Sequence, residues 1–279
     1  MNKSRLILVT NDDGIQSRGL WAAVEAMLPL GHVVVVAPNR QWSGAGRAVP
    51  IDVSGEVTTC SRLVDGRQVP AFAVDASPAL CVVHAMTELL PRRPSLVISG
   101  INYGANMSIE VTASGTVGAA LEAAAFGLPA IAVSQEMDPD LYLEGDENEA
   151  FGAAKRYSQH FADQLLGGAM PYDVDVLNLN VPKGAGPSCG WRSTRLSRHR
   201  YHEPTAPNRQ NGQGRPTYCR IRHPEMTELD SDIRTVMCDR LVSMTPLSLD
   251  LTSRGMAANP LWQMSVSAIE SIYAGTTVA

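Results

Sequence analysis

Short apolar runs alternate with longer amphipathic stretches along the first two thirds of the chain. The runs are rich in Val, Ile and Leu and end at turn or polar residues, which is typical of strands buried on both faces of a parallel sheet. In the stretches between them, apolar residues recur at helical spacing. The predicted strands are Arg5–Thr10, Val33–Val36, Leu96–Ile98, Ala130–Val133 and Val174–Asn180. The predicted helices are Ser17–Leu28, Ser77–Leu90, Gly115–Phe126 and Glu147–Leu166.

This alternation predicts an α/β fold, in which residues 1–184 form a three-layer, doubly wound and mostly parallel sheet of the Rossmann-like kind. Within Val57–Val74, two β-type runs flank Asp65-Gly66, which is a hairpin signal. The core should therefore carry an antiparallel hairpin beside its parallel strands.

The pattern changes in the last third of the chain. Gly, Pro, Arg and Asn dominate residues 185–217, β-type runs return at 217–222 and 234–245, and a helical pattern appears only at Asn259–Tyr273. A segment with so few core residues is not expected to fold alone. We therefore predict that residues 185–279 form an extended β-rich arm and a C-terminal helix, which pack on the core or on a partner subunit.

Composition narrows the class of protein. The 279 residues are 44% hydrophobic and 18% charged, as in an ordinary globular enzyme, and the formal net charge of −5 gives no basic field for a nucleic-acid duplex. The five cysteines are widely spaced and lack a Cys-x-x-Cys motif, which favours idle thiols in a reducing compartment. The first apolar run is too short for a signal sequence, and no stretch approaches the roughly 20 apolar residues of a membrane span. We therefore expect a cytoplasmic protein.

Basic residues crowd one stretch of the predicted arm: Arg192, Arg195, Arg198, His199 and Arg200. Such a cluster could meet an anionic substrate or a partner subunit. The plainer interpretation is a solvated rim with local ion pairs.

Two adjacent acids, Asp12 and Asp13, follow the first predicted strand. Side by side at the end of a buried strand, their like charges repel and lose hydration, and a divalent cation would relieve both costs. Carboxylate oxygens are ligands that hard ions such as Mg²⁺ and Mn²⁺ prefer, and ligands of open parallel sheets bind at the carboxyl ends of strands. The pair thus predicts a metal site. In the alternative interpretation, one Asp caps the following helix and the other is solvated.

The loop after the strand Leu96–Ile98 is the second candidate. Asn102 and Asn106 supply neutral hydrogen-bonding side chains, and the loop leads to Ser114–Thr116 at the start of a predicted helix. The free N–H groups and positive dipole end of a helix start suit a phosphate. Alternatively, Ser114 is an N-cap and the loop is ordinary. Together with the acidic pair, this loop predicts a metal-plus-phosphate site.

These motifs resemble a known family. The segment Asn11-Asp-Asp-Gly-Ile-Gln-Ser-x-Gly19 resembles the opening of the SurE (survival protein E) nucleotidase family, and Ser99-Gly-Ile-Asn-x-Gly-x-Asn-Met107 with Ser114-Gly-Thr-Val117 resembles its second block. Its later landmarks are similar to Leu177-Asn-Leu-Asn-Val-Pro182, Gly190-Trp191 and Val242-Ser-Met-Thr-Pro-Leu247. The resemblance covers about residues 5–252.

The resemblance implies a divalent-metal phosphomonoesterase that acts on nucleoside 5′- and 3′-monophosphates. The implied ligands of one Mg²⁺ or Mn²⁺ ion per subunit are Asp12, Asp13, Ser43 and Asn102. The implied phosphate-binding residues are Asn106, Ser114, Gly115 and Thr116. The resemblance also implies a homodimer or homotetramer with exchanged C-terminal elements, which agrees with the predicted arm.

The predicted reaction is attack by metal-activated water, because the sequence offers no obvious covalent nucleophile. Asp12, Asp13 and Asn102 are the predicted catalytic residues. Dipoles from Asn106 and from the helix start at Ser114 would stabilise charge on the equatorial oxygens of the phosphoryl group.

The chain departs from the usual pattern of the family at Ala48, Leu80, Glu110 and Ala113, none of which is an implied metal ligand. Several of these residues border the substrate cleft, so the preferred nucleotide is not predicted. The departures also leave an alternative function open, a metal-dependent nucleotide-binding or regulatory protein without turnover.

Two other protein classes also place acids after their first strand. A haloacid-dehalogenase-like phosphatase needs Asp-x-Asp there, whereas Asn11-Asp12-Asp13 has the wrong spacing. A signalling receiver domain needs a phospho-acceptor Asp after a middle strand and a Lys after a later one, and neither follows Ile98 or Val133. Neither class fits the chain.

Overall fold

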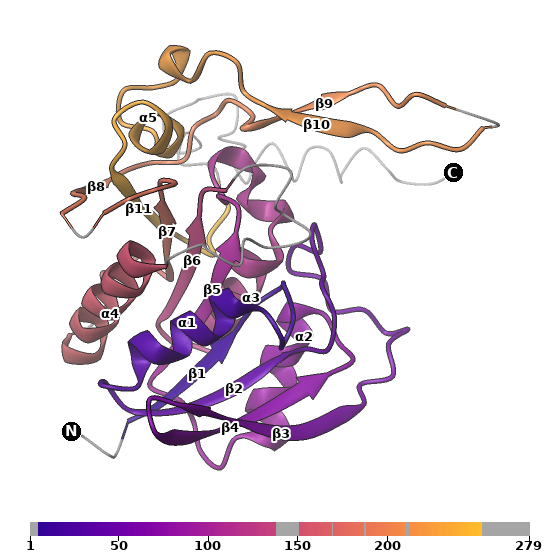
Figure 1. Ribbon diagram of the computed structural model, residues 1–279, viewed down its shortest axis with the longest axis vertical. Helices are drawn as coiled ribbons and strands as arrows, with labels where there is room; N and C mark the ends of the chain where they lie inside the picture. Colours follow the sequence, from indigo (N-terminus) through magenta and orange to yellow (C-terminus); the bar gives the residue numbers. More distant parts are fainter. Residues whose placement is uncertain (1–4, 138–150, 169, 187, 210–211, 253–279) are drawn as a thin grey trace, which may run out of the picture. The chain divides into compact units, whose positions relative to one another are not determined.

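The structure is a computed structural model that describes residues 5–137, 151–168, 170–186, 188–209 and 212–252 (Figure 1). Contacts between residues group the chain into two units, Met1–Leu249 and Asp250–Ala279. All the helices and strands named below lie in the first unit. The predicted helix at Asn259–Tyr273 lies outside the described residues.

Within the described residues, nine strands form one large sheet. They are β1 Leu6–Thr10, β2 His32–Pro38, β3 Val57–Val64, β4 Arg67–Val74, β5 Leu96–Tyr103, β6 Ala130–Gln135, β7 Val176–Val181, β8 Trp191–Ser193 and β11 Val242–Leu247. Their order across the sheet is β3-β4-β2-β1-β5-β6-β7-β11-β8. The neighbours from β4 through β7 are parallel, which confirms the predicted α/β fold.

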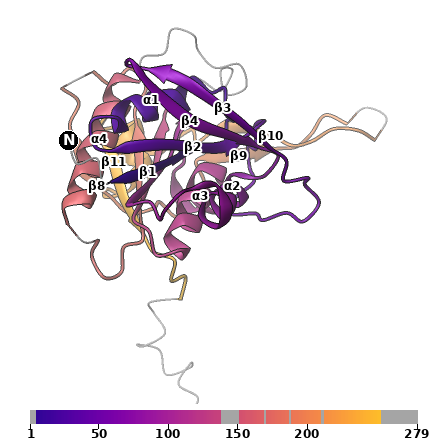
Figure 2. The same cartoon turned by 90° about the horizontal axis from the view of Figure 1, so that it is seen from below.

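Helices cover both faces of the sheet, as Figure 2 shows. They are α1 Arg18–Met27, α2 Pro78–His84, α3 Gly115–Ala125 and α4 Gly152–Gly167, and a short π-helix, Ala85–Leu89, continues α2. α1 and α4 contact each other on one face, and α2 and α3 on the other. None of the described helices is both long and apolar enough to cross a membrane.

The first strand shows why the sheet strands read as unbroken apolar runs. Ile7 and Val9 belong to the hydrophobic core on one face of the sheet, and Leu6 and Leu8 belong to the core on the other. Because successive side chains point to opposite faces, a strand covered by helices on both sides must be apolar at every position.

β1 lies between β2 and β5, at the point where the strand order reverses direction. From β1 the chain passes through α1 to β2 on one side and later returns to β5 on the other. In an open α/β sheet, the crevice outside the carboxyl ends of two such strands is where ligands bind. The turns after β1 and β5 are therefore the place to look for a site.

The predicted hairpin is confirmed as β3 and β4, which pair antiparallel at the edge of the sheet. Asp65 and Gly66 form its two-residue turn with φ values of 47° and 73°. Both positive φ angles match the turn type that suits the twist of paired strands, which explains the Asp-Gly sequence.

The sheet continues past residue 184. β11 pairs antiparallel with β7, and β8 pairs with β11. The strands β9 His202–Thr205 and β10 Thr217–Arg220 form a separate antiparallel hairpin, which projects from the upper part of Figure 1. The described part of the predicted arm is therefore β-rich, and the division of the chain at residue 184 stays a prediction.

One local expectation is wrong. Residues 234–245 were expected as a β-type run, but Asp232–Met237 form the short helix α5, and β11 begins only at Val242. Ser231 caps this helix by accepting a hydrogen bond from the Arg234 N–H at 3.3 Å. Ser231-Asp232 is a helix-start signal that outweighs the β-branched residues after it.

Candidate active site

The acidic pair lies at the topological switch point. Asp12 and Asp13 follow β1 directly, and Asn102 and Tyr103 lie at the end of β5, the neighbouring strand. A register shift in the pairing of β5 with β6, between Ser99 and Asn102, marks an irregularity at this edge. Such bulges redirect side chains at sheet edges near functional sites.

Asp12 is only 6% exposed, and it lies against the start of α3. Its Oδ1 accepts a hydrogen bond from the Thr116 hydroxyl at 2.5 Å, and its carboxylate also accepts one from the Thr116 backbone N–H. A Cβ atom on Gly115 would lie 2.8 Å from the Asp12 Cβ and 2.9 Å from its Oδ2. Only glycine lets the helix come this close to the carboxylate.

Asp13 is held more loosely. Its Oδ2 accepts a hydrogen bond from the Tyr103 N–H at 3.2 Å, and its Oδ1 accepts one from Gln41 at 3.5 Å. Among the described residues, neither Asp12 nor Asp13 forms an ion pair with a Lys or Arg side chain. The two carboxylates therefore face each other's charge without a protein cation.

The pKa values of both carboxylates are raised. Burial raises the pKa of Asp12 to about 6, although hydrogen bonds from Thr116 partly oppose the shift. Burial, and after it the charge of Asp12, raises the pKa of Asp13 well above its usual range. A bound cation would reverse both effects, because it favours the charged carboxylates.

Asn102 is 9% exposed and is fixed by its own loop. Its Nδ2 donates to the Gly104 carbonyl at 2.8 Å. With the nitrogen of the amide used in this way, Oδ1 is the atom of the side chain that can serve as a ligand of a hard cation.

Asn106 is anchored by two side chains of β7. The Asn106 N–H donates to Asn180 Oδ1 at 2.7 Å, and the Asn106 carbonyl accepts from the Nδ2 groups of Asn178 and Asn180 at 2.8 and 3.0 Å. The Asn106 side chain donates to the hydroxyls of Thr116 at 3.3 Å and Ser134 at 2.9 Å. One chain of hydrogen bonds thus connects Asn106 to Asp12 through Thr116.

Asn178 and Asn180 were not predicted as site residues, although their segment was quoted for the family resemblance. A signal was available in the sequence. Two Asn residues at alternate positions of an otherwise apolar, fully buried strand must place their amides on one face, where they need partners. Those partners are the backbone groups of Asn106.

Ser114 begins α3. Its Oγ accepts a hydrogen bond from the Val117 N–H at 3.1 Å, so the side chain acts as the N-cap. The backbone amides of Gly115 and Thr116 form the first turn of this 11-residue helix at the side of Asp12. The helix dipole favours negative charge at this end.

Ser43 lies in an exposed turn at the flank of the site. The turn is attached at both ends: the Trp42 N–H donates to the Asp12 carbonyl at 2.8 Å, and the Gly46 N–H donates to the Ala113 carbonyl at 3.0 Å. Among the described interactions, no hydrogen bond joins Ser43 to the other predicted metal ligands. The structure therefore brings together the predicted residues after β1, after β5 and at the start of α3, and it places Ser43 beside them.

The basic cluster of the arm is used in local ion pairs. Arg195 pairs with Asp230 at 2.8 Å and Arg200 with Glu110 at 3.4 Å, while Arg192 pairs with Asp239. These contacts support the interpretation of the cluster as a solvated rim.

The fold and the site together define an α/β protein with an acidic pair at its switch point, Asp12 buried and Asp13 half-buried, beside the start of α3. Comparison with known proteins identifies the family. The family model described as survival protein SurE matches residues 7–203, and the chain belongs to this family. The resemblance seen in the sequence is thereby confirmed.

Relatives named 5′-nucleotidase SurE are similar over most of their length. The one from Thermococcus gammatolerans is 39% identical over 249 residues, which are 89% of this chain and 91% of the relative. The one from Archaeoglobus fulgidus is 41% identical over 249 residues, with 88% and 92% covered. The crystal structure of the SurE protein from Aquifex aeolicus superposes with a TM-score of 0.72 at 29% identity, and covers 96% of this chain and 99% of its own.

Proposed function

We propose that this chain is a metal-dependent 5′-nucleotidase, which hydrolyses nucleoside 5′-monophosphates, and also 3′-monophosphates, to nucleoside and phosphate. The observation that carries the proposal is the hydrogen bond from the Thr116 hydroxyl to Asp12, which joins the acidic pair directly to the start of α3. The names of the relatives support the same reaction class.

The residues present fit one Mg²⁺ or Mn²⁺ ion. Among the described residues, no group of three or more His, Cys, Asp and Glu side chains could hold a metal, so a cation here would need neutral oxygen ligands beside the two acids. Asp12, Asp13, Asn102 and Ser43 supply such a set. When bound, the ion provides Lewis acidity toward the phosphoryl group and lowers the pKa of a water molecule.

The protein groups bind and orient the phosphoryl group. The Gly115 N–H at the start of α3 and Asn106 Nδ2 are the proposed donors for its equatorial oxygens, where charge develops in the transition state. Asn106 Nδ2 donates to the Thr116 and Ser134 hydroxyls in this structure, so it would exchange one of them for a phosphoryl oxygen. The hydrogen bonds from Asn178 and Asn180 fix the Asn106 backbone before substrate arrives. The Ser114 hydroxyl is engaged as a helix cap, so water is the expected nucleophile.

The test is release of phosphate from a panel of 5′- and 3′-mononucleotides with Mn²⁺ or Mg²⁺, with and without EDTA. We expect turnover with metal only, and a loss of at least about 100-fold in kcat/KM for Asp12→Asn. Asp163→Asn is the matched control, because Asp163 is an exposed acid on α4. Full activity of Asp12→Asn would refute the proposal, and tight nucleotide binding without turnover by the natural chain would favour the regulatory alternative.

The family resemblance also supports a cytoplasmic homodimer or homotetramer. All five cysteines are free in the structure, which agrees with a reducing compartment. Light scattering of the purified full chain tests the assembly, and a monomer at micromolar concentration would contradict it.

A further inference from the structure

Asp232, at the start of α5, is a carboxylate with no exposed surface that lies far in sequence from the catalytic loops. Its Oδ2 accepts a hydrogen bond from the Ser108 N–H at 2.7 Å. Its Oδ1 accepts two more, from the N–H groups of Ser197 at 3.0 Å and Ile233 at 2.8 Å. One side chain thus joins three segments of the chain.

Ser108 is the link to the active site, because it follows Asn106 by two residues. Its φ of 62° is in the left-handed region that side-chain-bearing residues adopt at a cost. The next amide, that of Ile109, donates to the Ser197 carbonyl at 3.1 Å. Asp232 therefore lies at a turn that is held in an unfavourable conformation by its hydrogen bonds.

Apolar contacts act in the same place. Ala105 and Met107, the residues on either side of Asn106, are buried in a small cluster with Ile233 and Val236 of α5. The helix that carries Asp232 therefore supports the Asn106 loop both by packing and by hydrogen bonding.

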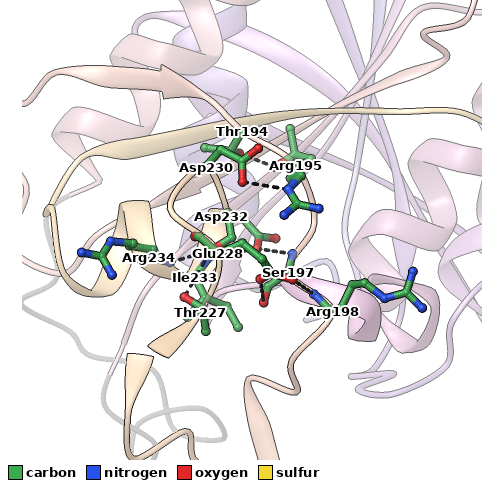
Figure 3. A network of polar contacts seen from close by, with 12 residues as sticks. Thr194, Arg195, Ser197, Arg198, Thr227, Glu228, Asp230, Asp232, Ile233 and Arg234 are labelled. Carbon is green, nitrogen blue, oxygen red and sulfur yellow. Dashed lines mark hydrogen bonds and ion pairs between the residues drawn. The ribbon is translucent and has the colours of Figure 1, made fainter. Parts of the chain in front are cut away.

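Figure 3 shows that a second carboxylate, that of Glu228, is directed at Ser197 and Arg198, the segment that Asp232 also contacts through the Ser197 N–H. Glu228 accepts from the Ser197 hydroxyl at 2.7 Å and from the Arg198 N–H at 3.1 Å. At the edge of this network, the Asp230 side chain forms an exposed ion pair with Arg195. Asp230 is thus close to Asp232 in sequence but does not reach the catalytic loop.

We propose that Asp232 is a positioning residue of the active site, whose carboxylate joins the Ser108 and Ser197 amides and thereby fixes the loop that carries Asn106. The inference rests on the proposed function, in which Asn106 binds the phosphoryl group. Asp is required because both oxygens must accept, and in Asn one of them is replaced by an NH2 group that cannot accept from an N–H.

The test compares Asp232→Asn with Asp230→Asn, which makes the same chemical change two residues away. For Asp232→Asn we expect a fall of about 10- to 100-fold in kcat/KM with 5′-mononucleotides, because the donor is displaced. The affinity for Mn²⁺ alone should stay within about twofold, since Asp232 contacts none of the proposed ligands. Hydrogen exchange should increase at residues 105–111 and not across the sheet. Asp230→Asn should match the natural chain in all three measurements.

A rescue variant separates positioning from general damage. Ser108→Gly removes the steric cost of the left-handed turn, so in the Asp232→Asn background it should recover about fivefold in kcat/KM. Equal activity of Asp232→Asn and Asp230→Asn would overturn the proposal. So would a joint loss of Mn²⁺ affinity and activity with faster exchange throughout the protein.

The proposal can still be tested if Asp232→Asn does not fold or if the natural chain shows no turnover. If Asp232→Asn does not fold, the exchange of the Ser108 amide in the natural chain decides: slow exchange is expected, and exchange at the rate of an unstructured peptide would overturn the proposal. If the natural chain releases no phosphate, the proposed function fails, while local exchange and the affinity for inorganic phosphate still test the role of Asp232.

Discussion

Buried or half-buried Asp carboxylates occur at the acidic pair after β1 and at the start of α5, and their surroundings differ. Asp232 has no acidic residue next to it in the sequence, and it accepts hydrogen bonds from three backbone N–H groups at 2.7 to 3.0 Å. Asp12 and Asp13 stand next to each other, and the contacts of Asp13 are longer, at 3.2 and 3.5 Å. Burial raises the pKa in both regions, but only the pair adds repulsion between like charges. Asp232 has the environment of a structural anion, whereas the environment of the pair fits the proposed cation.

The closest contact of the paired site gives the largest expected effect. Gly115→Ala places a Cβ 2.8 Å from the Asp12 Cβ, so the start of α3 must move away from the carboxylate. We expect a fall of about 100-fold in kcat/KM and a loss of about 1–3 kcal/mol in the free energy of unfolding. Gly152→Ala, at the open start of α4, is the control and should leave both values nearly unchanged. Unchanged activity of Gly115→Ala would show that the contact does not matter.

The pH dependence of stability tests the raised pKa of Asp12. The folded pKa of Asp12, about 6, lies above the value near 3.9 of an unfolded chain. The folded state therefore holds the proton more tightly, and its stabilisation is full below about pH 4 and is lost as the pH rises through 6. In EDTA, urea unfolding should show the natural chain losing about 2–3 kcal/mol relative to Asp12→Asn between pH 4 and 7.5. Parallel pH profiles of the two proteins would contradict this assignment.

Asn178 and Asn180 both hydrogen-bond to the Asn106 backbone, and substitutions of the two residues should differ in effect. Asn180 bonds both the N–H and the carbonyl of Asn106, whereas Asn178 bonds the carbonyl alone. Asn180→Leu should leave a buried amide without a partner and lower kcat/KM by about 10-fold. Asn178→Leu should have a smaller effect, because Asn180 still donates to the same carbonyl. Equal kinetic effects of the two variants would indicate that general packing of β7, not the anchoring of Asn106, is what counts.

The smallest effect is expected at the rim. Arg195→Gln breaks the exposed ion pair with Asp230 and should leave the free energy of unfolding nearly unchanged. Thermal or urea unfolding at low and high salt measures it. A large loss of stability would mean that the exposed Arg195–Asp230 ion pair, and not Asp232, stabilises this region.

Much of the fold could be predicted because it depends on local patterns. The strand Leu6–Thr10, the Asp65-Gly66 turn and the alternation of unbroken apolar runs with helical spacing are visible in short windows of the sequence. The position of Asp12 and Asp13 follows from one topological rule, that ligands bind at the carboxyl ends of parallel strands.

The remaining features depend on contacts between distant residues. The bond from the Ser108 amide to Asp232 spans 124 residues, and β11 pairs with β7 although β8, β9, β10 and α5 lie between them in the chain. A six-residue helix such as α5 is too short to show periodicity, so its β-branched residues were misleading. The position of Ser43 relative to the acidic pair could not be predicted either, because the side chains of a loop follow no regular spacing.

The central claim is that Asp12 and Asp13 form a cation site, and calorimetric titration of the EDTA-treated, dialysed full chain with Mn²⁺ tests it most directly. We predict binding of one ion per subunit, together with proton release that is larger at pH 6 than at pH 8, and loss of this binding in Asp12→Asn but not in Asp163→Asn. Mn²⁺ binding of equal affinity in Asp12→Asn, or no binding by the natural chain, would contradict the claim.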